Sequence, residues 1–186
     1  AIYAMHSVIT LTDVVFESNG AWQGSGGALF AGFSTVAITR CIFSNNRAQG
    51  GGAIALQNTS LSVSDVTFNY NIADYSGGAL FLQESTASLA GITAMHNIAA
   101  EGAGFRCWSS KITASEWAIL FNNTNLMGAG SEWVCNGDCS IVADGQGIFV
   151  SDALCNLTLP AISKGHGADD NDDVWLSDVV PSGIGV

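Results

Sequence analysis

Carboxylates gathered near the end of the chain are the residues best suited to bind a cation. The segment GADDNDDVW at 167–175 packs four Asp residues into five positions. Asp169, Asn171 and Asp173 fit the first three ligand positions of a calcium loop. However, Val174 replaces the glycine of such a loop, and Val180 replaces its final acidic ligand. We therefore interpret the segment as a solvated acidic tail, and we predict no metal ion and no cofactor.

A column of charged residues is the nearest candidate for acid–base chemistry. One outward position of the repeat described below is occupied in turn by Asp13, Arg40, Asp65, Gly91 and Glu116. Cleavage of uronate polysaccharides needs acids that hold calcium beside an Arg or Lys base. Alternating charges also reduce repulsion along an exposed ladder. The histidines are isolated at His6, His96 and His166, so we predict no catalytic residues.

Five cysteines offer local disulfides rather than a framework for the whole domain. Cys135 and Cys139 are close enough to form a small loop, and either can instead pair with Cys155. Cys41 and Cys107 fall at inward positions of the repeat. We interpret both as buried thiols that act as small apolar residues.

Two further groups of residues are candidates for surface contacts. Trp108 and Trp133 are 25 residues apart, which predicts that they stack on one flank. They are candidates for a face that binds a partner protein or a glycan, and the alternative is that they cover the cap or pack against the chain's own tail. Sequons at Asn58 and Asn156 are the predicted glycosylation sites. A third sequon, at Asn122, belongs to a repeated asparagine and is expected to stay bare.

Composition and charge narrow the classes of partner. Five Lys and Arg against sixteen Asp and Glu give a net charge of −11, which argues against nucleic acid and against anionic membranes. No apolar run approaches the 18 residues of a membrane-spanning helix. The acidic balance suits solubility outside cells, or cation binding, and we expect an extracellular or cell-surface location. The chain opens in an alternating strand pattern, so we expect a processed product or a piece of a longer protein.

Two markers repeat with one period of about 25–26 residues. One is an asparagine that lies three residues after a Phe, with the Phe replaced in the last two copies. Its copies are Asn19, Asn46, Asn71, Asn97 and Asn122. The other is a glycine doublet before Ala and a large apolar residue, and its second glycines are Gly27, Gly52 and Gly78. Two ladders in step identify an internal repeat.

Alternation between the markers predicts strands. Apolar columns such as Val36, Leu61, Ala87 and Ile112 alternate with Ser, Thr and Ala positions. One repeat cannot bury its own apolar face, so equivalent residues must stack on the repeats above and below. The sequence predicts an all-β, right-handed parallel β-helix over residues 1–130. Residues 131–186 are expected to form a last coil, a Cys-containing cap and the acidic tail.

The motifs GGAL, FSNN, GGAI, FNYN and GGAL, in that order, resemble the repeats of the chlamydial polymorphic outer-membrane proteins. They are also similar to repeats of eukaryotic extracellular proteins with pectin-lyase-like β-helices. The resemblance covers roughly residues 8–130. It implies a right-handed β-helix in a secreted or surface protein used for adhesion or as a structural shaft.

These observations favour a non-enzymatic extracellular module, a shaft segment of an adhesin, surface fibre or matrix protein. Its expected partners are other copies of the chain, other surface or matrix proteins, and glycans. Polymerisation into a filament is a further hypothesis. The alternative is a carbohydrate-binding or carbohydrate-active protein of the pectin-lyase-like kind.

Overall fold

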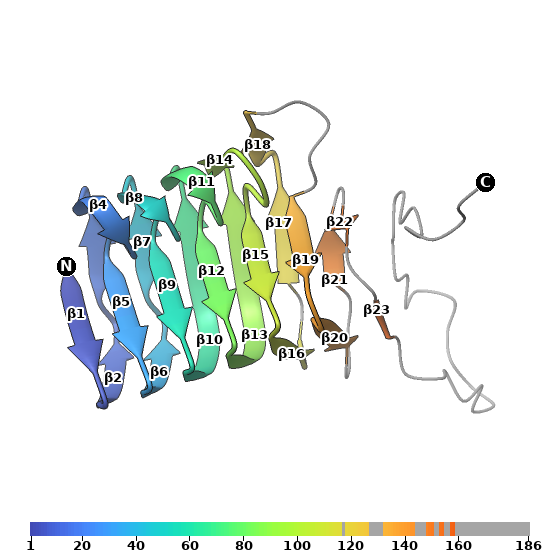
Figure 1. The fold of residues 1–186 in the computed structure, drawn as a ribbon, viewed down its shortest axis with the longest axis horizontal. Helices are drawn as coiled ribbons and strands as arrows, with labels where there is room; N and C mark the ends of the chain where they lie inside the picture. Colours follow the sequence, from blue (N-terminus) through green and yellow to red (C-terminus); the bar gives the residue numbers. More distant parts are fainter. Residues whose placement is uncertain (117, 127–131, 144–147, 151–152, 155–156, 159–186) are drawn as a thin grey trace.

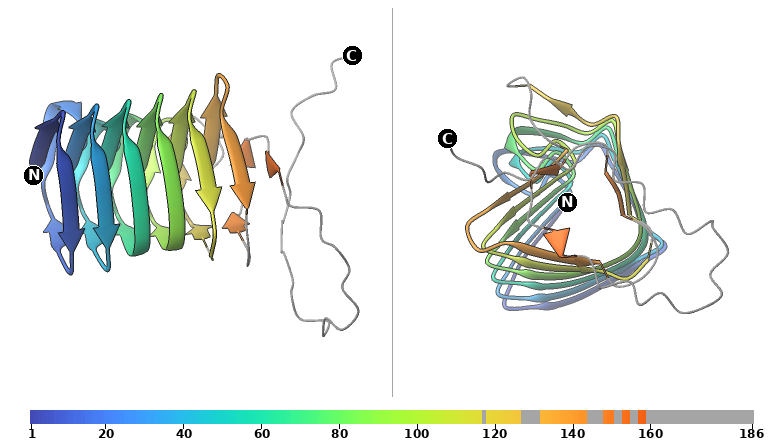
Figure 2. Two further views of the ribbon diagram at one scale, coloured as in Figure 1. Left: turned by 90° about the horizontal axis from the view of Figure 1, so that it is seen from below. Right: turned by 90° about the vertical axis from the view of Figure 1, so that its right-hand side faces the viewer.

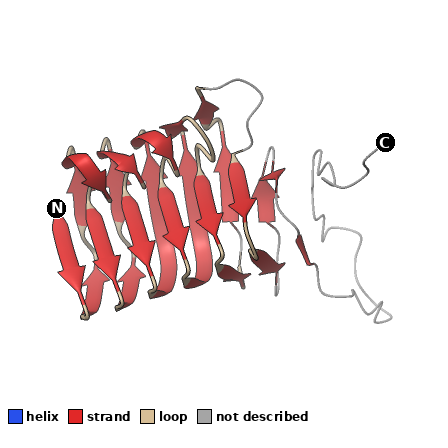
Figure 3. Ribbon diagram, in the orientation of Figure 1, coloured by secondary structure: helices blue, strands red, loops and turns tan. Residues whose placement is uncertain are grey.

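Short parallel strands form the architecture of this chain. The structure is a computed structural model that describes residues 1–116, 118–126, 132–143, 148–150, 153–154 and 157–158. All strand pairs are parallel, and none of the described residues is helical, as Figure 3 shows. The predicted all-β parallel solenoid is confirmed.

Each of the first five coils contributes at least one strand to each of three sheets. The first sheet has seven strands, in the order β1 (Ile2–Met5), β5 (Leu29–Gly32), β9 (Ile54–Gln57), β12 (Leu80–Gln83), β15 (Phe105–Trp108), β19 (Trp133–Asn136) and β22 (Ala153–Leu154). The third sheet has five, β4 (Gly20–Ser25), β8 (Arg47–Gly50), β11 (Ile72–Ser76), β14 (Ile98–Ala99) and β18 (Thr124–Asn125).

The second sheet is the largest, with eleven strands. Its main path is β2 (Val8–Thr12), β6 (Thr35–Thr39), β10 (Ser60–Asn69), β13 (Thr86–Met95), β16 (Lys111–Ala114), β20 (Ser140–Ala143) and β23 (Leu157–Thr158). Alongside lie β3 (Val15–Glu17), β7 (Ile42–Ser44), β17 (Ala118–Phe121) and β21 (Ile148–Val150). Figures 1 and 2 show the coils stacked along one axis, with a roughly three-sided outline when viewed along that axis.

Equivalent apolar side chains stack inside the coil. Val36 pairs with Leu61, which pairs in turn with Ala87, and all three are buried. Phe16 lies over Phe43 with ring centroids 4.9 Å apart, and the next ring of this column continues the stack 5.3 Å further on. Burial of one such side chain stabilises the fold by about 1.5–3 kcal/mol. The core is therefore a continuous column that runs through the described coils from Phe16 to Ile141.

The two glycines of each doublet have different roles. The first has a positive φ, which L-residues with a Cβ adopt at a cost, in Gly26, Gly51 and Gly77. The second is crowded by the next coil. A Cβ on Gly27 would lie 2.2 Å from the carbonyl oxygen of Gly52, and a Cβ on Gly52 would lie as close to that of Gly78. The corner therefore needs one glycine for its turn and one for close stacking.

The stacking continues past residue 130. Strand β19 pairs with β15, and β20 pairs with β16, with the same parallel geometry as the earlier coils. The connection before β19 is longer, because Phe105 pairs with Trp133 whereas the preceding step joins Leu80 to Phe105. The acidic segment 167–175 lies outside the described residues.

Candidate functional site

A file of asparagine side chains runs along the corner between the second and third sheets. Asn46 donates from Nδ2 to Oδ1 of Asn71 at 2.9 Å, and Asn71 donates in the same way to Asn97 at 2.9 Å. Each Oδ1 also accepts the backbone N–H of the preceding asparagine, and each Nδ2 also donates to a backbone carbonyl. These three residues are fully buried. The amides thus accept the backbone N–H groups of the corner and add hydrogen bonds to carbonyls of the strands beside it.

The fifth member of this file is Asn123, and the prediction of Asn122 is wrong. Asn97 donates to Oδ1 of Asn123 at 2.9 Å. Strand β17 is shifted by one residue, since Phe121 pairs with Met95. Asn122 therefore aligns with His96 in the exposed turn, where both have positive φ. Beyond it, the Glu132 carboxylate accepts the backbone N–H of Asn123 at 3.0 Å.

Sequence reasoning missed a second polar file at the corner between the first and second sheets. In each coil a Ser or Thr hydroxyl accepts the backbone N–H of the equivalent residue one coil earlier, over distances of 3.0–3.3 Å. The accepting residues are Ser34, Thr59, Ser85 and Ser110. Cys139 takes the next position, and its Sγ accepts the N–H of Ser110 at 3.4 Å. These Ser and Thr residues recur with the period of the repeat, so the file could have been predicted from the sequence.

The predicted charged column lies on an exposed corner of the second sheet. Arg40 makes a bidentate contact with Asp13, with nitrogen–oxygen distances of 2.7 and 2.8 Å. Asp13, Arg40, Asp65 and Gly91 all have positive φ and occupy the same turn position of successive coils. The column thus pairs Arg40 with Asp13, and no second acid of the column shares this contact.

Removing Arg40 is expected to change the titration of Asp13. The hydrogen bond from Arg40 holds the pKa of this carboxyl below its ordinary value. A depressed pKa in the folded state stabilises the fold above the unfolded pKa, and this contribution is lost as the pH falls through the folded value. In Arg40→Met the pKa of Asp13 should rise to its ordinary value, measured by carboxyl-carbon NMR. Arg47→Met is the control and should leave it unchanged.

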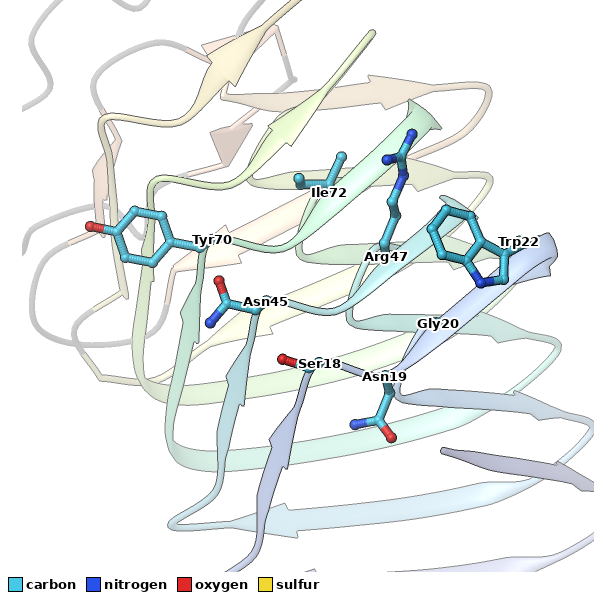
Figure 4. A pocket seen from close by; sticks show the side chains of 8 residues that line it. All are labelled: Ser18, Asn19, Gly20, Trp22, Asn45, Arg47, Tyr70 and Ile72. Atoms are coloured by element: carbon cyan, nitrogen blue, oxygen red, sulfur yellow. The ribbon is translucent and has the colours of Figure 1, made fainter.

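A shallow groove of about 330 Å³ crosses three coils on the third-sheet side of the asparagine corner. Figure 4 shows Trp22 and Arg47 together at one end, Tyr70 at the other, and Ser18 and Asn45 between them. The rings are accessible, since Trp22 is 73% and Tyr70 54% exposed. The spacing of these two residues matches no period of the repeat, so the groove was not predictable from the sequence pattern.

Neighbouring side chains fix the groove residues in place. The Arg47 guanidinium lies over the Trp22 ring at 5.4 Å and donates to Asp74 at 2.8 Å. Tyr70 stacks on His96, with centroids 4.9 Å apart. Because Asp74 neutralises Arg47, the groove offers aromatic faces, hydroxyls and amides rather than a net charge. Such a surface can bind a flat, hydroxyl-bearing ligand.

The predicted tryptophan face is not formed. Trp108 is exposed at the end of β15, but Trp133 is fully buried. Trp133 pairs with Phe105, and their rings meet edge to face at 5.2 Å. The long connection before β19 shifts the register by three residues. Since an odd shift moves a strand side chain to the opposite face, the residue expected outside points into the core.

Four of the five cysteines are placed by the structure. Cys41 and Cys107 are buried free thiols, as expected from their inward columns. Cys139 is also a free thiol, so the Cys135–Cys139 loop is not formed. Cys135 is in a disulfide, and Cys155 lies outside the described residues. The sulfurs of Cys107, Cys135 and Cys139 all lie within 4.8 Å of one another.

Of the two predicted glycosylation sites, one lies in the described part of the chain. Asn58 is in the turn between β9 and β10, half-buried, with a φ of 49°. Its neighbour Thr59 is buried in the hydroxyl file. Asn156 lies outside the described residues. Attachment of a glycan at either position stays a prediction.

Comparisons with known proteins agree with this architecture. The family model of the Chlamydia polymorphic membrane protein repeat matches residues 13–32, 40–57 and 65–83. A metabotropic glutamate receptor-like protein Q of Dictyostelium discoideum is 49% identical over 51 residues, which are 27% of this chain and 4% of that protein. No solved structure matches the chain.

The chain therefore spans only a small part of the curated relative that it matches. Each matched segment begins at the charged corner turn and runs through the asparagine file and the glycine doublet. The described residues contain no helix that is long and apolar enough to cross a bilayer. The described part of the chain is a β-solenoid in which three segments match the Chlamydia polymorphic membrane protein repeat model, and this similarity fits a cell-surface protein.

Proposed function

We propose that this chain is a non-enzymatic structural and adhesive segment of an extracellular or cell-surface protein. In this role it acts as a stiff shaft, and its flanks contact other copies, other surface proteins or glycans. The presence of three repeats of a polymorphic membrane protein type supports a surface location. A shaft needs repeated units that bind each other along one axis, and the stacked coils provide them.

The buried asparagine file is the observation that carries this proposal. Within it, Asn71 connects to the coil on either side through its side-chain amide, at 2.9 Å in both directions. The hydroxyl file does the same at a second corner, where Ser85 joins Thr59 and Ser110. Ladder hydrogen bonds of three sheets add to both files. A load along the axis is thus shared by several parallel rows of bonds.

Single-molecule pulling on the chain tests the shaft. Leu29 pairs with Ile54 at a step of 25 residues, so peeling one coil releases about 9 nm of extended chain. We expect a series of force peaks at about this spacing, and they should return after the chain is relaxed. Extension without resolvable peaks would contradict a load-bearing role.

Glycan binding is a second candidate function, and the groove between Trp22 and Tyr70 favours it. Exposed rings flanked by hydroxyls and amides suit the apolar face and polar rim of a sugar. The neutralised Arg47 favours a neutral sugar over an acidic one.

A glycan array probed with the purified chain tests the groove. We expect binding to neutral oligosaccharides that falls at least tenfold in Trp22→Ala. Trp108→Ala removes a tryptophan that is also exposed but lies on the first sheet, and it should bind like the unmodified chain. Equal losses in the two variants, or no bound glycan, would rule out this role for the groove.

A further inference from the structure

A cluster of three sulfur atoms lies inside the coil where β15 and β19 pair. Cys107 and Cys135 are direct partners across these strands, and their sulfurs are 3.2 Å apart. The Cys139 sulfur completes a group whose members all lie within 4.8 Å of one another. Cys135 is already in a disulfide, while the other two are free thiols. Two reduced sulfurs thus lie beside an oxidised one.

The Cys107 thiol is in an environment that preserves it as a thiol. The residue is fully buried, and it continues the inward column of Leu56 and Leu82. Burial, reinforced by the neighbouring Cys139 thiol, raises the pKa of Cys107 far above its usual range. The thiol is therefore protonated and unreactive once the chain has folded.

Cys139 departs from the pattern of its own column. The other members of the hydroxyl file are Ser and Thr, and each accepts a backbone N–H from the coil before it. The Cys139 sulfur keeps this role toward Ser110 and donates to the carbonyl of Asn136 at 3.1 Å. A serine would serve the corner equally well. Cysteine therefore adds a chemistry that the corner itself does not need.

We propose that Cys107 and Cys139 are a dithiol site that closes to a second disulfide beside that of Cys135. The oxidant is a small disulfide such as oxidised glutathione. One sulfur attacks it and displaces one thiol, and the second sulfur then attacks the mixed disulfide and displaces the other thiol. The two cysteines lose two protons and two electrons, and the oxidant leaves as two thiols. The reaction takes place during folding, before both sulfurs are buried.

Closing this bond ties β15 to the corner that precedes β20. The bond to Ser110 survives, because the Cys139 sulfur accepts that hydrogen bond and needs no proton for it. Only the donation to Asn136 is lost. The site then joins two coils covalently at a point where the sequence repeat has become irregular. This proposal does not depend on the shaft or glycan role of the chain.

Counting thiols tests the proposal. The full chain is refolded with reduced and oxidised glutathione, then unfolded and labelled with a maleimide. If the Cys107–Cys139 disulfide forms, the unmodified chain carries one maleimide adduct, on Cys41. Cys139→Ser should carry two adducts, because Cys107 then has no cysteine to pair with. Cys41→Ala should give none. Because serine already occupies this corner in the earlier coils, Cys139→Ser is expected to fold.

Peptide mapping and thermal unfolding complete the test. A cross-linked peptide joining Cys107 to Cys139 is expected, and its reduction should lower the melting temperature by about 10 °C. Three adducts in the unmodified chain would overturn the proposal, as would a cross-link between Cys107 and Cys135. A bound zinc ion that protects all three thiols until a chelator is added would also overturn it, because the cluster would then be a metal site.

Discussion

Asn71→Leu is expected to lower the free energy of unfolding by about 3–5 kcal/mol. The Asn71 side chain makes four hydrogen bonds inside the corner, to Asn46, Asn97 and the Phe43 carbonyl. Leucine leaves the buried backbone N–H of Asn46 without its acceptor, which costs about 1–3 kcal/mol, and it removes three further side-chain hydrogen bonds worth about 0.5–1.5 kcal/mol each. Urea unfolding followed by far-ultraviolet circular dichroism measures the difference.

Asn69→Leu is the matched control in the same coil. Asn69 lies two residues away in β10, and its Oδ1 is buried without a hydrogen-bond partner. The same substitution there removes an unsatisfied polar atom, so stability should stay the same or rise. If the two variants unfold within about 1 kcal/mol of each other, the asparagine file does not hold the coils together.

Asn71→Asp separates lost hydrogen bonds from lost packing, because the two side chains have nearly the same size. A carboxylate there would face the Phe43 carbonyl and the Asn97 amide oxygen, which Nδ2 now contacts at 2.9 Å. Burial and these oxygens would raise its pKa in the folded state. The variant should therefore lose stability as the pH rises above about 4 and regain part of it in acid. The pH dependence is opposite for the Asp13–Arg40 pair, whose contribution to stability is lost in acid.

The periodic part of the fold was predictable because each coil repeats the same physical requirements. The Val36, Leu61 and Ala87 column needs an apolar residue in every coil, and the glycine doublet needs a turn and a close approach each time. A single apolar residue or glycine doublet is ambiguous in a sequence, but several copies at one spacing identify the strand and the corner. The period, the inward faces and the all-parallel pairing follow from that redundancy.

The errors fall where one coil differs in length from the others. An extra residue between Ala114 and Ala118 moves the file from Asn122 to Asn123. Both positions carry the same amino acid, so nothing in the local sequence distinguishes them. Trp133 fails in the same way, because the count from Trp108 ignores the longer connection before β19. A period locates coils of equal length, and it carries no information about an insertion.

The groove escaped prediction for a different reason. Trp22 comes from the third sheet and Tyr70 from the turn before it, in coils that are not adjacent. No column contains both, so only the curvature of the corner brings them to one surface. The cysteine cluster was only partly predictable from the columns of the repeat. Cys107 and Cys135 share a column, but Cys139 reaches them from the hydroxyl file.

Gly52→Ala is expected to have the largest effect of the single substitutions considered, a loss of more than about 4 kcal/mol or a failure to fold. The new Cβ would lie 2.2 Å from the carbonyl oxygen of Gly78 and 2.7 Å from backbone atoms of Ile72. These atoms belong to the next coil, whose backbone is held by ladder hydrogen bonds. No side-chain rotation relieves the contact, so the two coils must separate.

Two other glycines give a graded comparison for this substitution. Gly24→Ala places its Cβ no closer than 4.0 Å to any atom, at the Ala21 side chain, and should change stability by less than about 0.5 kcal/mol. Gly50→Ala meets the Ser25 hydroxyl at 3.4 Å, so it should be intermediate. Thermal unfolding and the soluble yield rank the three variants. Stability of Gly52→Ala close to that of Gly24→Ala would mean that the coils are not packed closely enough to require a glycine, and the reason for the second glycine of each doublet would lie elsewhere.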